Sequence, residues 1–271
     1  MDPKLRELRA ILQPMGRVLV AYSGGVDSSF LLWAATETLG RDRVLAVTAT
    51  SPIVAPKDLA RAQDVATQLR VQHLMIPTGQ MEDQQFLQNS VQRCYYCKRE
   101  TLSRLVEMAQ EKGFPWVVEG SNVDDREEFR PGKQAVTELG VRSPLEEACL
   151  TKADIRELSR QVGLPTWHLP AQTCLATRFP HAAPLTMQGL NQVAQAEAVL
   201  QQMGFDQVRV RHHGAIARIE VPGDQIEQLA APDTSARVVA ALRLVGFDYV
   251  TADLDGYRRG NLSELPDATA G

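Results

Sequence analysis

The chain has 271 residues, 44% of them hydrophobic, and its 29 Lys and Arg against 33 Asp and Glu give a formal net charge of −4. This size allows a sizeable core, which we expect to be divided into one medium domain and one small domain. The acidic balance argues against a protein that holds nucleic acid mainly through its phosphates. No apolar run is long enough for a membrane span and the first residues lack a signal-peptide pattern, which predicts a soluble, cytoplasmic protein with no membrane partner.

Strand and helix patterns alternate along the first part of the chain. Strands are predicted over residues 17–22, 44–50, 72–76 and 115–119. Helices are predicted over residues 26–39, 56–69, 98–112 and 151–162. The last of these helices has Thr151 as its N-cap, Asp154 three residues further on, and Gly163 to end it. This alternation is typical of βαβ units and predicts a parallel α/β sheet flanked by helices.

The segment between the first strand and the first helix carries the clearest chemistry. It reads Ser23-Gly24-Gly25-Val26-Asp27-Ser28-Ser29. The glycines let the backbone approach an anion, the hydroxyls donate hydrogen bonds, and the amides of the following helix point at the same place. A carboxylate would repel phosphate, so Asp27 is expected to hold Mg²⁺ against a leaving pyrophosphate and to act in catalysis. An ordinary Gly-Ser turn is the competing interpretation.

This loop differs from other nucleotide-binding loops. It has neither the lysine of GxxxxGK[ST] nor the spacing of GxGxxG. It resembles the PP-loop of N-type ATP pyrophosphatases, which include GMP synthetase, NAD synthetase and tRNA-thiolating enzymes. The predicted binding residues for ATP and pyrophosphate are Ser23, Gly24, Gly25, Asp27, Ser28 and Ser29.

A second unit follows a long, proline-rich loop over residues 164–184, and loops of this length in enzymes are usually functional. Beyond it we predict a helix over 187–203, a β-hairpin over 208–221, a helix near 237–245 and a strand near 247–254. The predicted domains are therefore residues 1–180 and a small α/β domain over residues 181–271. Period-two alternation in the hairpin puts Val208 and Val210 on the buried face and Arg209 and Arg211 on the opposite face.

Four cysteines suggest a metal site before disulfides, because the chain looks intracellular. Cys94 and Cys97 form a CxxC motif at the start of a helix, and Cys174 lies in the proline-rich loop. Together with Cys149 they fit structural zinc, although Cys149 lies in a helical-looking spacer where a buried thiol is the ordinary case. Without Cys149 they fit a [4Fe–4S] cluster with one open iron. Spacing alone does not decide between the two metals.

Several motifs together resemble one family over most of the chain, from about residue 5 to about residue 262. They are the PP-loop, Arg93-Cys94-Tyr95-Tyr96-Cys97-Lys98, Glu119-Gly120-Ser121-Asn122-Val123-Asp124-Asp125, Arg130-Pro131-Gly132, Ser143-Pro144-Leu145, Cys174-Leu175-Ala176-Thr177-Arg178 and Asp253-Leu254-Asp255-Gly256-Tyr257-Arg258. These motifs are similar to those of LarE, the ATP-dependent sulfur transferases of nickel-pincer nucleotide cofactor synthesis.

The resemblance implies a PP-loop ATP pyrophosphatase fold, also described as adenine nucleotide alpha hydrolase-like. It implies that ATP adenylates carboxylates of pyridinium-3,5-biscarboxylic acid mononucleotide, releasing pyrophosphate, and that sulfur then displaces AMP. In some members the cysteine matching Cys174 gives up its own sulfur and becomes dehydroalanine. Members with three cysteines, matching Cys94, Cys97 and Cys174, instead resemble a class that binds [4Fe–4S] and passes on sulfide, which favours the cluster over zinc.

The resemblance also implies a substrate site and an assembly. Arg178, Arg209, Arg211 and Arg258 would bind the phosphate and carboxylates of the substrate, since guanidinium groups bind such anions bidentately. For a single arginine, a solvated surface charge is the competing interpretation. Glu220 matches a glutamate near a metal at the oligomer centre, although pairing with Arg218 is equally good. A homo-oligomer, a hexamer in the family, and a separate sulfide source are the expected partners.

Other polar and aromatic residues have two interpretations each. Tyr95 and Tyr96 would stack on a pyridinium ring or belong to the core. His212 and His213 precede a turn glycine and are more often exposed than metal-bound.

Asp124 and Asp125 would bind magnesium or ribose, or cap a helix. Two other functions remain open: a PP-loop tRNA thiolase, and an ATP-binding regulatory protein with structural zinc.

Overall fold

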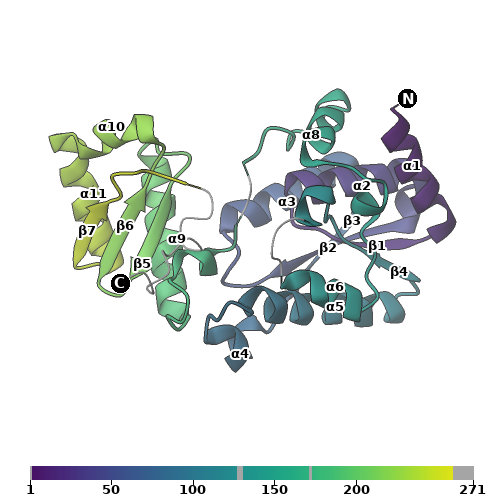
Figure 1. Ribbon diagram of the computed structural model, residues 1–271, viewed down its shortest axis with the longest axis horizontal. Coiled ribbons are helices and arrows are strands. Elements are labelled where there is room, and N and C mark those ends of the chain that lie inside the picture. The colour runs from purple at the N-terminus through teal and green to yellow at the C-terminus, as the bar shows by residue number, and fades with distance from the viewer. Residues whose placement is uncertain (1, 127–130, 171–172, 259–271) are drawn as a thin grey trace, which may run out of the picture. The chain divides into compact units, whose positions relative to one another are not determined.

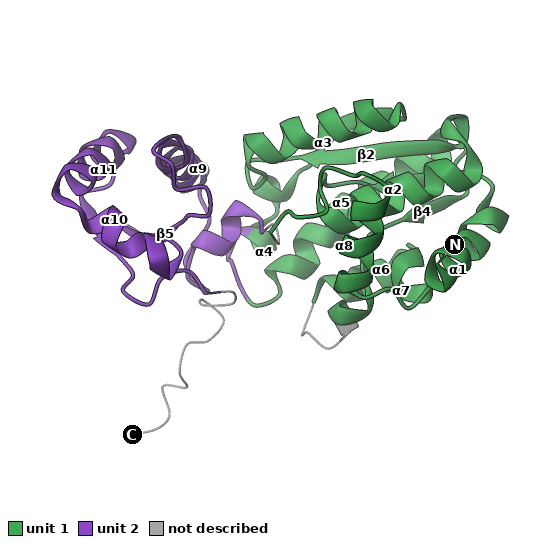
Figure 2. Cartoon of the chain, turned by 90° about the horizontal axis from the view of Figure 1, so that it is seen from above, with its two compact units in different colours: residues 1–86, 91–172 green, residues 87–90, 173–271 purple. Residues whose placement is uncertain are grey.

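The computed structural model describes residues 2–126, 131–170 and 173–258. They form two compact units, one of residues 1–86 and 91–172 and the other of residues 87–90 and 173–271 (Figure 2). Residues 173–180 group with the second unit. None of the helices in the described ranges is long and apolar enough to cross a membrane. Arg130, part of one family motif, lies outside the described residues.

The first unit contains a four-stranded sheet in which every pair of neighbours is parallel. Its strands are β1 (Val18–Ala21), β2 (Val44–Thr50), β3 (Gln72–Pro77) and β4 (Trp116–Val118). Their order is β3-β2-β1-β4, and Val18 of β1 pairs with Val44 on one side and with Trp116 on the other. This confirms the predicted parallel α/β sheet.

Helices cover both faces of this sheet (Figure 1). One side carries α1 (Pro3–Leu12), α2 (Val26–Leu39), α3 (Pro56–Leu69) and α8 (Lys152–Gln161), and the other carries α5 (Arg93–Glu111) and α6 (Gly132–Glu138). Two further helices are single turns, α4 (Gln84–Leu87) and α7 (Pro144–Glu147). The unit is a sheet between two helical layers, as the resemblance implied.

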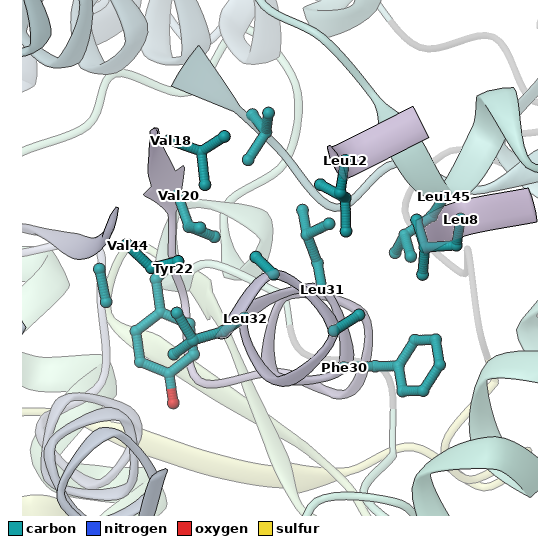
Figure 3. Packing of buried hydrophobic residues seen from close by; sticks show 14 of the residues in the cluster. Leu8, Leu12, Val18, Val20, Tyr22, Phe30, Leu31, Leu32, Val44 and Leu145 are labelled. Atoms are coloured by element: carbon teal, nitrogen blue, oxygen red, sulfur yellow. The ribbon is translucent and has the colours of Figure 1, made fainter. Parts of the chain in front are cut away.

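Successive residues of each strand point to opposite faces of the sheet, and this produces one hydrophobic core on each face. Val18 and Val20 belong to the cluster that includes α1, α2 and α8, whereas Leu19 between them packs with Leu102 and Leu105 of α5. Figure 3 shows the first cluster, with Leu31 and Leu32 of α2 close to the strand residues. Strands buried on both faces are typical of parallel sheets.

The strand order decides where a ligand can bind. β1 lies between β2, the strand that follows it in sequence, and β4, to which the chain returns later. The connections leaving β1 and β4 at their carboxyl ends therefore diverge, and such switch points are where open α/β sheets hold their ligands. The loop Ser23–Ser29 lies at this point, directly after β1.

The second unit is a three-stranded sheet with helices. β5 (Arg209–His213) and β6 (Ile216–Glu220) form the predicted antiparallel hairpin, and β7 (Tyr249–Ala252) runs parallel to β6. Its helices are α9 (Met187–Gln202), α10 (Ile226–Ala230) and α11 (Pro232–Val245). Leu200, Phe205 and Leu242 are among the residues that form its core with the hairpin.

Candidate functional site

Gly24 is required at the centre of the loop for two physical reasons. Its φ is +71°, a conformation that residues with a side chain rarely adopt, and a Cβ there would lie 2.9 Å from Cα and Cβ of Ala62 on α3. The same helix supplies Arg61, whose Nε donates to the Gly24 carbonyl at 3.1 Å. The close approach of α3 therefore shapes the loop and fixes one of its carbonyl groups.

Hydroxyl groups hold the rest of the loop. The Oγ atoms of Ser23 and Ser28 lie 3.0 Å apart, the Ser23 amide donates to Ser28 Oγ at 3.2 Å, and the Gly25 amide donates to Ser23 Oγ at 3.3 Å. Gly25 is the N-cap of α2, and none of the described side chains caps that helix. The first-turn amides of α2 are thus directed at the loop, where an anion can satisfy them.

Asp27 lies in the first turn of α2 and is only half satisfied. Its Oδ2 accepts from Lys152 Nζ at 2.5 Å, while its Oδ1 is buried and accepts no hydrogen bond from the described residues. Burial raises the pKa of Asp27 above its ordinary value, although the Lys152 ammonium opposes the shift and the Asp125 carboxylate adds to it. A buried carboxylate oxygen without a partner fits a cation ligand, so the residues present are compatible with Mg²⁺.

The segment after β4 forms the adjoining wall. A Cβ on Gly120 would lie 3.1 Å from the Ser28 amide nitrogen, so this backbone runs close to the start of α2. Glu119 is buried and accepts from Lys98 Nζ at 2.9 Å and from Ser143 Oγ at 2.5 Å. Burial alone would raise the pKa of Glu119, but the Lys98 charge and the hydrogen bonds from Ser143, Lys98 and Ser121 hold it below its ordinary value. Glu119 is therefore an ionised anchor that joins α5 to the wall.

The CxxC motif occupies the first turn of α5. Cys94 is exposed and Cys97 is partly buried, and both side chains are thiols on one turn of the helix. Cys174 belongs to the second unit. Among the described residues, no three His, Cys, Asp or Glu side chains gather as a metal-binding group. The cluster and the zinc site both stay predictions.

Cys149 has an environment that the sequence did not suggest. We expected a buried thiol in a helical spacer, but Cys149 is exposed and follows the short helix α7 with a φ of +53°. Its Sγ lies 3.9 Å from the Glu147 carbonyl oxygen. The expectation of burial was wrong because the chain turns out of the helix immediately before this residue.

The Cys174 loop is held by buried polar contacts within the second unit. Cys174 precedes a 3₁₀ turn over Leu175–Arg178, and its carbonyl accepts from the Thr177 hydroxyl at 2.7 Å. Arg178 is 3% exposed and binds both carboxylate oxygens of Glu197 on α9, at 2.7 and 3.1 Å. Its remaining nitrogen donates to Thr173 and Thr177. Arg178 therefore links the loop to α9.

Two arginines of the hairpin, Arg209 and Arg211, are buried rather than solvated. Arg211 donates to the Thr177 carbonyl at 2.9 Å and to Glu220 at 2.6 Å. Glu220 also accepts from Arg218 at 3.1 Å, so the predicted pairing with Arg218 is confirmed, with Arg211 as a further partner.

Arg209 is 9% exposed, and none of the described carboxylates lies within ion-pair distance of it. Its guanidinium lies 5.4 Å from the centre of the Tyr257 ring. Burial lowers the pKa of Arg209, and the neighbouring charge of Arg178 adds to the effect. A buried cation in this state favours an anionic ligand.

Other predicted residues have local partners. Arg258 is exposed and donates to Asp255 at 2.8 Å. The Tyr95 and Tyr96 rings each lie 5.3 Å from the Arg99 guanidinium, and the Tyr95 hydroxyl donates to Glu138 at 2.8 Å.

The two neighbouring histidines differ in their surroundings, and the two neighbouring aspartates differ in their hydrogen-bond partners. The His212 ring stacks on Phe179 at 4.7 Å, whereas His213 is exposed as expected. Asp124 accepts from the Lys152 amide at 2.9 Å, and Asp125 accepts from the Asn122 amide at 3.0 Å.

Sequence reasoning missed the basic partners of the loop, Lys152 and Arg61, and the acidic partner of Arg178, Glu197. Lys152 lies 125 residues beyond Asp27, so no local spacing connects the two. One signal was present: a lysine in the first turn of a helix is opposed by the helix dipole. Such a placement suggests that the cation serves another group.

The fold and the loop together define a class. A parallel sheet whose first strand leads through an SGGxDSS loop into a helix, with a carboxylate in the first turn of that helix, is typical of the PP-loop ATP pyrophosphatase fold. In agreement, residues 8–108 match the family model described as NAD synthase.

The chain belongs to the LarE family, that of pyridinium-3,5-bisthiocarboxylic acid mononucleotide synthase. It is 37% identical over 261 residues to the Lactiplantibacillus plantarum protein of that name, and the aligned region covers 96% of this chain and 94% of the relative. It is 40% identical over 265 residues to an uncharacterized protein of Synechocystis sp., with 98% of each chain covered. A protein of Methanocaldococcus jannaschii, also uncharacterized, is 28% identical over 247 residues, covering 89% and 91%.

Proposed function

We propose that this protein is an ATP-dependent sulfur transferase that converts carboxylates of pyridinium-3,5-biscarboxylic acid mononucleotide into thiocarboxylates for nickel-pincer cofactor synthesis. The single observation that carries the proposal is the Ser23–Ser29 loop, with uncapped helix amides beside a buried, half-satisfied Asp27 carboxylate. Family membership supports the choice of substrate. The proposal includes a cytoplasmic homo-oligomer that receives sulfide from another source.

The loop performs the activating half of the reaction. Ser23, Gly24, Gly25, Ser28 and Ser29 bind the β- and γ-phosphates through amides and hydroxyls. A carboxylate oxygen of the substrate attacks the α-phosphorus of ATP, and the bond to pyrophosphate breaks. Asp27 would hold Mg²⁺, which supplies positive charge to the departing pyrophosphate when bound. The product of this half is an acyl-adenylate, whose AMP is a good leaving group.

The cysteines serve the sulfur-transfer half. A sulfur nucleophile forms a bond to the activated acyl carbon, and the bond to AMP breaks with its electron pair. We propose that Cys94, Cys97 and Cys174 hold a [4Fe–4S] cluster, which would supply the sulfide when bound. Cys94 and Cys97 support this proposal because they place two thiols, one exposed and one partly buried, on one helical turn. Loss of sulfur from Cys174 itself is the alternative route.

Arginines of the second unit bind the substrate in this proposal. Arg209 is the strongest candidate, because it is buried without a carboxylate at ion-pair distance among the described residues. Arg211 and Arg258 would contact the same phosphate or carboxylates. Arg178 adds positive charge near Arg209, while its own donors hold the Cys174 loop.

The test is a reaction of the anaerobically purified protein with ATP, Mg²⁺, sulfide and the pyridinium substrate. We expect pyrophosphate and AMP to form only with the substrate present, and the substrate mass to increase by the exchange of oxygen for sulfur. D27N should release no pyrophosphate or AMP and should leave the mass of the substrate unchanged. ATP binding without pyrophosphate release in the wild-type protein would contradict the proposal.

The sulfur source is tested in the same sample. Iron and acid-labile sulfide, with an unchanged protein mass after turnover, would support the cluster. Absence of iron together with conversion of Cys174 to dehydroalanine would refute the cluster and leave the transferase assignment standing.

A further inference from the structure

Lys152 forms a contact with Asp27 that no sequence motif requires. Its Nζ lies 2.5 Å from Asp27 Oδ2, and both side chains are partly buried, with 30% and 24% of their surfaces exposed. The second oxygen of the carboxylate, Oδ1, is buried and accepts no hydrogen bond from the described residues. Lys152 is thus the cation that neutralises the carboxylate proposed to hold Mg²⁺.

The position of Lys152 is built by several other residues. It is the first residue of α8, whose N-cap Thr151 forms a reciprocal capping box with Asp154. The Lys152 amide donates to the Asp124 carboxylate at 2.9 Å, which fixes the backbone from which the ammonium extends. α8 is anchored to the core of the first unit through Ile155 and Leu158. These contacts therefore fix the backbone at the start of α8, from which the Lys152 side chain extends.

The charge balance around Asp27 explains why a cation is needed there. Asp27 is a largely buried carboxylate, and the charge of Asp125 also acts on it. Without a positive partner, both desolvation and repulsion would disfavour its ionised form. The Lys152 ammonium supplies this positive partner at Oδ2. However, the ammonium also occupies Oδ2, so Lys152 and a metal ion compete for this carboxylate.

We propose that Lys152 is a replaceable counter-ion that blocks metal binding at Asp27 until a nucleotide arrives. A metal ion entering with ATP displaces the ammonium, and the phosphates of the nucleotide supply it with new acceptors. A metal ion entering alone meets the positive charge of this ammonium and offers it no such acceptors. The metal and the nucleotide therefore bind together, which prevents a bare cation from occupying the loop. This inference rests on the proposed ATP-dependent function.

The test measures metal binding without nucleotide and without the pyridinium substrate. Mn²⁺ replaces Mg²⁺, and its binding is followed by electron paramagnetic resonance at mildly alkaline pH, which favours ionised carboxylates in general. We expect K152M to bind Mn²⁺ about tenfold more tightly than the wild-type protein, because the competing charge is gone. K152R, which keeps the charge, should bind Mn²⁺ as weakly as the wild type. K152M should bind Mg·ATP more weakly than the wild type.

Two controls make the result decisive. D27N combined with K152M should lose the added Mn²⁺ affinity, which locates the metal at Asp27. Tryptophan fluorescence reports whether each variant folds, because all three tryptophans, at 33, 116 and 167, lie in the first unit. Unchanged or weaker Mn²⁺ binding in folded K152M would overturn the inference. The titration uses no substrate, so that outcome would leave the proposed sulfur transfer untouched, and a failure of sulfur transfer would leave the titration valid.

Discussion

Gly24→Ala is the substitution whose effect can be worked out most fully from the structure. The new side chain would have to adopt a φ near +71°, which costs about 1–2 kcal/mol for an L-residue. Its Cβ would also lie 2.9 Å from the Cα and Cβ of Ala62, so backbone has to move. Overpacking of this kind costs about 1–3 kcal/mol. We therefore expect G24A to lose about 2–5 kcal/mol of unfolding free energy.

Gly163→Ala is the matched control. Gly163 lies in the same unit with a φ of +75°, but a Cβ there would meet nothing within 4 Å. It therefore has the conformational cost without the collision, about 1–2 kcal/mol. The difference between the two variants isolates the contact with α3.

The assay measures the unfolding free energy of each variant and its rate of pyrophosphate release. Urea unfolding followed by tryptophan fluorescence gives the stability of the first unit, which contains every tryptophan. Pyrophosphate release should fall about 100-fold in G24A, because a displacement of about 1 Å at a reacting group has effects of that size. G163A should stay within about twofold of the wild type. If G24A released pyrophosphate at the wild-type rate, or the two variants were equally unstable, the steric role of Ala62 would be refuted.

Three further outcomes are expected. C94S should lower the iron content of anaerobically purified protein by at least about half, whereas C149S should leave it unchanged, and equal losses in both would contradict the ligand set. E197Q should weaken the second unit by about 3–5 kcal/mol, because it leaves Arg178 buried without its charge partner, and amide hydrogen exchange of residues 173–258 should accelerate. The pKa of Glu119 is lowered in the folded state, so its contribution to stability is complete above the unfolded value of 4.5 and is lost as pH falls through the folded value. E119Q should flatten this part of the pH–stability curve, and an unchanged slope would show that another group causes it.

Local patterns predicted the elements well wherever the signal is contained within a few residues. The strand before the Ser23–Ser29 loop, the helix after it, and the Thr151–Asp154 capping box all have this character, and all are confirmed. The parallel pairing of the strands followed from their alternation with helices, because parallel neighbours need crossover connections, whereas the strand order came from the structure. The fold of the first unit was therefore accessible from the sequence.

The partners of the site residues were not accessible, because tertiary packing selects them. Asp27 and Lys152 are 125 residues apart, and Arg211 and Thr177 are 34 apart. In the hairpin, period-two alternation separated the valines from Arg209, but alternation does not say that the second face is also covered. The burial of Arg209 and the pairing of Glu220 with Arg211 became visible only in the folded unit.

The membership of residues 87–90 in the second unit has a consequence for synthesis of the protein. Asn89 is fully buried, and its side-chain amide donates to the carbonyls of Pro180 and Ala183, while the Leu87 carbonyl accepts from the Leu185 amide. On the ribosome this short segment emerges long before those partners do. The first unit is therefore synthesised while the polar groups of this segment still lack their partners in the second unit. A continuous fragment covering residues 1–172 or 173–271 would separate these groups from their partners. We therefore expect the second unit to fold fully only when both fragments are part of one polypeptide chain.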